Sequence, residues 1–133
     1  MIFRQKITIV RISKPPKNIN EELQWFGNAL DLFNLRDKDK SCYRIFLELL
    51  KAAKKRQALT SDELAEKLNL TRGTVIHHIN KLMDSGLVIH DRNKYSLRVE
   101  KLEMLIEELQ KDLQRTVYNL KEVAIDIDRW MGI

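Results

Sequence analysis

The side chains best suited to do chemistry lie in one short segment, and they are hydrogen-bond donors rather than catalytic groups. Thr71 and Thr74 carry hydroxyl groups, and Arg72 carries a planar fork of N–H donors. His77 and Lys81 follow further along the same segment. Donors of these kinds bind phosphate oxygens and the edges of bases, so the segment predicts contact with a nucleic acid.

The apolar residues between these donors predict a helix over 72–84 with two distinct faces. Val75, Ile79 and Leu82 form one stripe at helical spacing. His77 points almost directly away from that stripe. The rest of the outward face is small, polar or cationic, and comprises Gly73, Thr74, Asn80 and Lys81. A helix of this width fits the major groove of DNA.

Residues near the start of such a helix are expected to reach base edges. Those residues are Thr71, Arg72, Thr74 and His77. Arg72 is the best candidate for a guanine because its donors form a planar fork, and Lys81 is assigned to a phosphate. Gly73 costs about 1 kcal/mol of helix stability relative to alanine. We interpret it as permitting close approach of the backbone to DNA, and a glycine that is tolerated without a role is the alternative.

A second cationic group is predicted at the tip of a β-hairpin. Residues 87–90 and 95–98 favour two short strands with a polar turn between them. The tip carries Arg92, Asn93 and Lys94. Beside a groove-bound helix these side chains would reach phosphates or the minor groove. A solvated hairpin with ordinary surface charge is the alternative.

The remaining reactive side chains form no recognisable catalytic or metal-binding pattern. His77 and His78 are adjacent, so their side chains diverge on a helix and cannot easily bind one metal ion. Cys42 is the only cysteine, and packing in a core helix is favoured over redox chemistry. The sequence contains no Gly-rich phosphate loop and no Ser or Cys grouped with His at a catalytic spacing. We expect no metal, no cofactor and no enzymatic activity.

The elements that must position these groups are predicted to be mainly helical. Capping residues mark three helix starts, at Ser41, at Thr60 with Glu63 as a capping box, and at Thr71. The predicted order is a strand over 2–12, helices over 20–35, 42–56, 60–68 and 72–84, the hairpin, and one long helix over 99–131.

Two runs carry a resemblance to a known family. They are SDELAEKL, at Ser61–Leu68, and TVIHHINKLMDSGLV, at Thr74–Val88. With their surroundings they resemble the winged helix-turn-helix of ArsR-like and MarR-like bacterial and archaeal regulators. The resemblance covers about residues 41–98 and implies that 72–84 is a recognition helix and the hairpin a wing. The metal-sensing members carry a cysteine pair near that helix, and this sequence has none there.

The chain is expected to have three parts. Residues 1–40 form an N-terminal strand and helix, 41–98 the winged helix-turn-helix, and 99–133 a dimerisation helix. The apolar stripe of the last part follows a heptad pattern with one extra four-residue step. Its members are Leu102, Ile106, Leu109, Leu113, Val117, Leu120, Ala124, Ile127 and Met131.

One small domain cannot bury a stripe of that length, so the sequence predicts a homodimer through 99–131, with 20–35 joining the same core. Folding of the long helix back onto 20–35 of its own chain is the alternative.

Two further parts of the chain have open roles. Strand 2–12 could extend the wing sheet or pair across the dimer. Trp25, Phe26 and Phe33 could line a small-molecule effector pocket, although their residue types favour ordinary core packing.

Charge separates the two ends of the chain. Residues 1–98 hold 19 of the 24 basic and 11 of the 19 acidic side chains, a net charge of +8, whereas 99–133 has a net charge of −3. The net positive charge of residues 1–98 suits binding to a polyanion.

The sequence shows no targeting or membrane segment. Arg4, Lys6 and Arg11 interrupt the first apolar residues too often for a signal peptide, and no segment approaches the ~20 apolar residues of a membrane span. We expect a cytoplasmic protein.

Together these observations predict sequence-specific binding of double-stranded DNA by a dimeric transcription regulator. Two alternatives share the same fold. One is a winged helix that docks on a protein of the transcription machinery. The other is an architectural chromatin protein that binds DNA without sequence preference.

Overall fold

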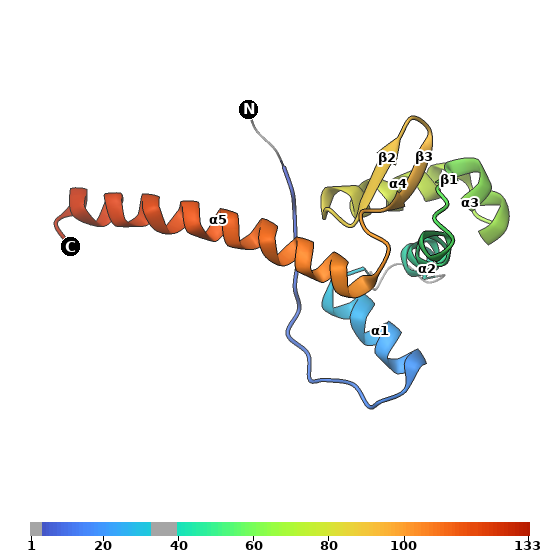
Figure 1. The fold of residues 1–133 in the computed structure, drawn as a ribbon, viewed down its shortest axis with the longest axis horizontal. Helices are drawn as coiled ribbons and strands as arrows, with labels where there is room; N and C mark the ends of the chain where they lie inside the picture. Colours follow the sequence, from blue (N-terminus) through green and yellow to red (C-terminus); the bar gives the residue numbers. More distant parts are fainter. Residues whose placement is uncertain (1–3, 33–39) are drawn as a thin grey trace. The chain divides into compact units, whose positions relative to one another are not determined.

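The computed structural model describes residues 4–32 and 40–133, and these fall into two compact units, one ending at Glu100 and one beginning at Lys101. The first unit contains helices α1 (Ile19–Ala29), α2 (Ser41–Lys54), α3 (Ser61–Leu68) and α4 (Arg72–Asp84), and strands β1 (Leu59–Thr60), β2 (Val88–Asp91) and β3 (Lys94–Leu97) (Figure 1). The second unit is helix α5 (Leu102–Met131). The expected fold class, mainly helical with a small sheet, is confirmed.

The three strands form one antiparallel sheet in the order β1-β3-β2. Val88 pairs with Leu97 in the hairpin, and Leu59 pairs with Tyr95 on the other side of β3. Arg92 and Asn93 make the two-residue turn, and Arg92 adopts a left-handed backbone with φ of 60°. The hairpin was predicted, but β1 was not, because two residues are too few to show an alternating pattern.

Capping residues place α3 and α4 as the sequence predicts. The Thr60 side chain accepts from the Glu63 N–H, and the Glu63 carboxylate accepts from the Thr60 N–H, which completes the capping box. Asn69 ends α3 in the left-handed region, with φ of 53°. The Thr71 hydroxyl then caps α4. These local bonds fix the turn between the two helices.

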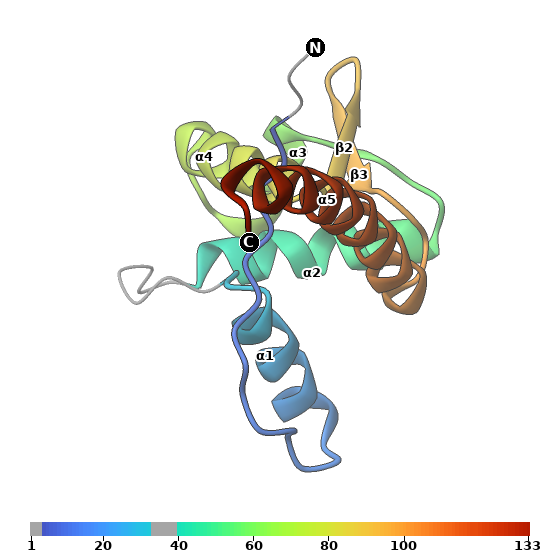
Figure 2. The same cartoon turned by 90° about the vertical axis from the view of Figure 1, so that its left-hand side faces the viewer.

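Helix α2 lies at the centre of the first unit, between α1 and the pair α3 and α4 (Figure 2). Its buried side carries Ile45, Phe46 and Leu49. Buried residues from α3, α4 and the strands complete the core, including Leu64, Val75, Ile79, Leu82, Leu87 and Leu97. Because all these side chains are apolar, the hydrophobic effect holds α3 and α4 against α2.

Helix α1 ends earlier than the predicted 20–35 helix. The Leu32 N–H donates to the Gly27 carbonyl and the Asp31 N–H to the Asn28 carbonyl, while Asp31 has φ of 55°. This is a Schellman motif, with buried Leu32 as its apolar anchor. The prediction of helix at 30–32 is therefore wrong, and residues 33–35 lie outside the described part of the chain.

The N-terminal segment is not the strand that was predicted over 2–12. Residues 4–12 form no strand and do not join the sheet β1-β3-β2, so the wing-sheet placement is wrong for them, and residues 2 and 3 lie outside the described part of the chain. Two separated backbone bonds hold the segment: Lys6 N–H to Asp84 O and Val10 N–H to Ala29 O, each 2.8 Å. β-branched residues favour an extended backbone, but a strand also needs a partner ladder.

Two other expectations are corrected or refined. Ser41 was predicted to cap its helix, but it is the first helical residue, and Lys40 precedes it with φ of 53° and no side-chain capping bond. The long helix begins at Leu102 rather than at 99. No helix in the described residues is both long enough and apolar enough to cross a membrane.

The aromatic residues considered for an effector pocket take part in packing. Trp25 donates its indole N–H to the Ser13 carbonyl, at 2.8 Å. The Phe26 ring stacks on the ring of Phe46, with centroids 6.2 Å apart. Both residues are half-buried and make their contacts within the first unit, and Phe33 lies outside the described residues.

Candidate nucleic-acid interface

The orientation of α4 follows from its apolar stripe. Val75, Ile79 and Leu82 are each 0% exposed, as the helical spacing predicted. The other face of the helix must therefore point outward. His77 is exposed, as its position opposite the stripe predicted, and His78 is half-buried.

The hydroxyl groups at the start of α4 form a small network. Thr71 Oγ1 accepts from the Thr74 N–H at 3.1 Å and lies 2.8 Å from Thr74 Oγ1. Each hydroxyl has one proton, and the contact between the two oxygens uses only one of them. The second proton can be donated to a ligand, so capping the helix and binding an acceptor are compatible roles for this pair.

Arg72 extends from the first turn of α4 into solvent. Its Nε atom lies 3.8 Å from Asp62 Oδ1 on α3, and both side chains are more than 70% exposed. An exposed ion pair of this length contributes little and is screened by salt. The guanidinium can therefore exchange Asp62 for a base or a phosphate at small cost.

Most of the remaining outward face of α4 is exposed. Gly73 and Lys81 are exposed, like His77, while Thr74 is half-buried. A Cβ placed on Gly73 would meet no atom within 4 Å, so packing within the chain does not require glycine there. Close approach of an external partner remains the physical reason we favour for this glycine.

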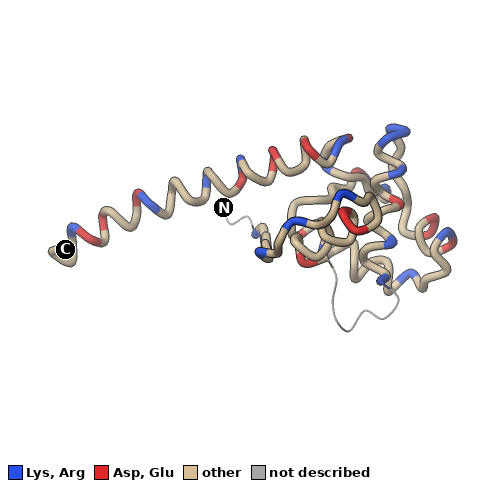
Figure 3. The backbone as a smooth tube through the Cα atoms, turned by 90° about the horizontal axis from the view of Figure 1, so that it is seen from below, with Lys and Arg blue, Asp and Glu red and all other residues tan. Residues whose placement is uncertain are grey.

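The hairpin tip presents the second predicted group. Arg92, Asn93 and Lys94 are all exposed, and they occupy the turn and the first residue of β3. Figure 3 marks the Lys and Arg positions in blue along the backbone. The structure thus exposes every predicted site residue except the half-buried Thr74.

Sequence reasoning missed the neighbours of the second half of α4. Asp84 adds a carboxylate to the outward face, and the N-terminal segment runs beside it. Gln5 Nε2 donates to the Ser85 carbonyl at 3.1 Å, next to the bond from Lys6 N–H to Asp84 O. No local sequence pattern predicts such contacts, because they join residues that are far apart in the sequence.

Other titratable or reactive groups stand apart from this face. Cys42 on α2 is 1% exposed, as expected for a packed thiol. Burial raises the pKa of the Tyr43 hydroxyl, so this group stays protonated at neutral pH.

Comparison with known proteins supports the class of fold. Residues 47–89 match the family model described as winged helix-turn-helix DNA-binding. The match begins within α2, covers α3 and α4, and ends in β2. No curated protein and no solved structure matches the chain.

Proposed function

We propose, from the winged helix-turn-helix DNA-binding match over residues 47–89, that this chain is a dimeric transcription regulator that binds double-stranded DNA at specific sequences. One observation carries the proposal. Helix α4 has its apolar stripe of Val75, Ile79 and Leu82 buried, and its opposite side presents hydroxyl, guanidinium, imidazole and ammonium groups to solvent. Such a face matches the acceptors of the major groove and its flanking phosphates.

Within the proposal, the start of α4 reads bases. Arg72 donates two bonds to a guanine, and Thr71, Thr74 and His77 contact neighbouring base edges or phosphates. Gly73 lets the helix backbone approach the groove floor. Lys81 binds a phosphate further along. The predicted likeness to ArsR-like and MarR-like regulators is part of this proposal, and no catalytic role is assigned to any residue.

The hairpin serves as the wing. Arg92, Asn93 and Lys94 bind the sugar-phosphate backbone or the minor groove beside the recognition helix. Their exposure supports this role, because long cationic side chains at a two-residue turn can reach a duplex without moving the core.

Helix α5 supplies the dimer contact. Val117, Leu120, Ile127 and Met131 belong to the predicted stripe, and each is more than half exposed. A second copy of the same helix is the partner we assign, since a heptad-like stripe is complementary to itself. The predicted contribution of 20–35 to the same dimer core stays part of this proposal, with Phe26 packed on Phe46 of its own α2.

Fluorescence anisotropy with duplex DNA at several salt concentrations tests DNA binding directly. We expect affinity to fall steeply with salt, with a slope set by the number of phosphates bound. Selection from a random duplex pool should then enrich a palindromic sequence, because a twofold dimer presents two recognition helices. Salt-insensitive or absent binding would instead favour the protein-docking alternative, and salt-sensitive binding without enrichment would favour the architectural one.

A further inference from the structure

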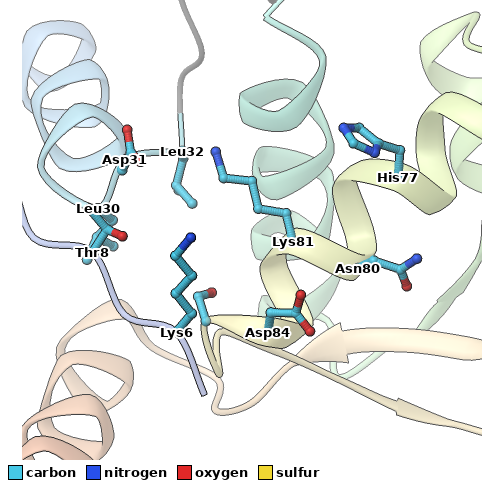
Figure 4. Close-up of a pocket in the computed structure, with 10 residues that line it drawn as sticks. Lys6, Thr8, Leu30, Asp31, Leu32, His77, Asn80, Lys81 and Asp84 are labelled. Carbon is cyan, nitrogen blue, oxygen red and sulfur yellow. The ribbon is translucent and has the colours of Figure 1, made fainter. Parts of the chain in front are cut away.

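An open pocket of about 400 Å³ lies between the N-terminal segment and the outward face of α4 (Figure 4). Lys6 lines it from the N-terminal segment, Lys81 and His77 from α4, and Leu32 from the chain after α1. The pocket therefore continues the face of α4 already assigned to DNA, on the side of its C-terminal end. It is formed by residues that no sequence motif joins.

The N-terminal wall of the pocket is held in place at three points. The Lys6 N–H donates to the Asp84 carbonyl at 2.8 Å, and the Gln5 side chain donates to the Ser85 carbonyl. At the other end, the Val10 N–H donates to the Ala29 carbonyl. These bonds fix the backbone from which the Lys6 side chain extends, so its ammonium group is presented at a defined place beside α4.

Two ammonium groups share this pocket. The side chains of Lys6 and Lys81 extend toward the same end of it (Figure 4). Among the described residues, no carboxylate forms an ion pair with either lysine. Asp31 and Asp84 also line the pocket, and they lie on opposite sides of the lysine pair (Figure 4). Two like charges directed to one place favour an anion that both can contact.

The positive charge of the N-terminal segment indicates that the pocket favours a negatively charged partner. Residues 4–17 contain five cationic side chains and no carboxylate. The cations are Arg4, Lys6, Arg11, Lys14 and Lys17. The two carboxylates of the pocket balance Lys6 and Lys81 locally, but the other four cations of the segment add a positive field, and the segment itself holds no carboxylate. A polyanion that passes along α4 would meet that field at this wall.

We propose that Lys6 and Lys81 together bind a phosphate group in this pocket, which makes the N-terminal segment a third nucleic-acid contact beside α4 and the hairpin. Lysine binds phosphate as a compact charge with three donors, and two lysines can share one phosphate. If the phosphate belongs to a DNA backbone, this inference rests on the proposed function. A phosphate on a small molecule has the same chemistry, and the pocket has room for such a ligand.

The DNA arm of the test measures duplex affinity by anisotropy at five salt concentrations. The variants are Lys6→Ala, Lys81→Ala and the double variant, with Lys17→Ala as the control that removes the same charge from the same segment outside the pocket. We expect each pocket variant to weaken binding about 3- to 10-fold. The double variant should lower the salt slope by about 0.9 and weaken binding by less than the product of the single effects, because both lysines act on one phosphate.

The phosphate arm titrates inorganic phosphate and follows backbone amide shifts by NMR. We expect residues 6 and 81 to shift together in the wild type, and these shifts to be lost in the double variant and kept in Lys17→Ala. Pocket-specific phosphate shifts with an unchanged DNA slope would assign the site to a small phosphorylated ligand and not to the duplex.

The proposal is overturned if the pocket variants behave like Lys17→Ala with DNA and phosphate produces no pocket shifts. Failure of the wild type to bind DNA would remove the proposed function instead, and the phosphate arm would still decide the present inference. Both lysines are exposed, so circular dichroism should show the same melting curve for every variant.

Discussion

Helices α4 and α5 are both amphipathic, yet they leave opposite kinds of surface exposed. On α4 the apolar stripe is fully covered, with Ile79 0% exposed, and the polar side faces solvent. On α5 several apolar side chains face solvent, with Leu120 64% and Ile127 55% exposed, although Leu105 and Leu109 near its start are buried. A polar face is stable in water and can bind a charged partner reversibly. An exposed apolar stripe is costly in water, so it indicates a partner with a matching apolar surface.

The largest expected effect concerns the covered side of α4. Ile79→Ala should lower the free energy of unfolding by about 2–5 kcal/mol, because it removes buried methyl and methylene groups and leaves a cavity against α2. Urea unfolding at one fixed protein concentration measures this loss. His77→Ala on the outward side is the matched control and should stay within about 0.5 kcal/mol of the wild type. Equal losses for the two variants would erase the distinction between the two sides of α4.

The next effect concerns the apolar face of α5. Leu120→Lys should raise the dissociation constant of the dimer by at least about 100-fold, because it places an unpaired charge in an apolar contact. Sedimentation equilibrium measures the constant. Glu122→Gln changes the net charge by the same amount on the far side of the helix and should leave the dimer intact. A wild type that sediments as a monomer at micromolar concentration, or a Leu120→Lys variant that still dimerises, contradicts the assignment of α5 as the dimer contact.

A smaller effect is expected on the outward side of α4. Arg72→Ala should weaken binding to the selected DNA site by about 1–3 kcal/mol and relax base preference at one position, since the guanidinium contacts a base. Anisotropy with the selected site and its single-base variants measures both changes. Lys67→Ala removes an exposed cation at the end of α3 and is the control. If the two variants lose affinity equally at every sequence, Arg72 contributes charge and no base reading.

The same comparison explains how much could be predicted from sequence. Helices α3 and α4 were predicted because their information is local: Thr60 and Thr71 cap them, and the spacing of Val75, Ile79 and Leu82 orients α4. The outward positions of Arg72 and His77 follow from that orientation. Their binding roles do not follow, because exposure is the ordinary state of charged and polar side chains.

Several errors of sequence reasoning involve non-local contacts. The β-branched segment at the N-terminus resembles a strand locally, but its backbone bonds go to Ala29 and Asp84, and neither continues as a ladder. Helix α1 stops where Leu32 finds a buried site, which spacing alone does not reveal. The juxtaposition of Lys6 and Lys81 has the same origin. Contacts between segments that are distant in sequence depend on how the whole chain packs, so a local sequence pattern does not predict them.

The smallest expected effect separates charge from backbone strain at the hairpin tip. Arg92 has φ of 60°, which costs a non-glycine residue about 1–2 kcal/mol, whereas glycine adopts it freely. Glycine also loses more entropy on folding, by about 0.5–1 kcal/mol, so Arg92→Gly should stabilise the protein by about 0.5–1 kcal/mol. Lys94→Ala is the matched control, because it also removes one cation but does not relieve the backbone strain at Arg92. If the wing contacts DNA, both variants should lower the salt slope by about 0.9, whereas only Arg92→Gly should raise the urea midpoint. Unchanged salt slopes would mean that the hairpin is an ordinary solvated turn that does not contact DNA. The nucleic-acid contact would then be confined to the polar side of α4 and its neighbours.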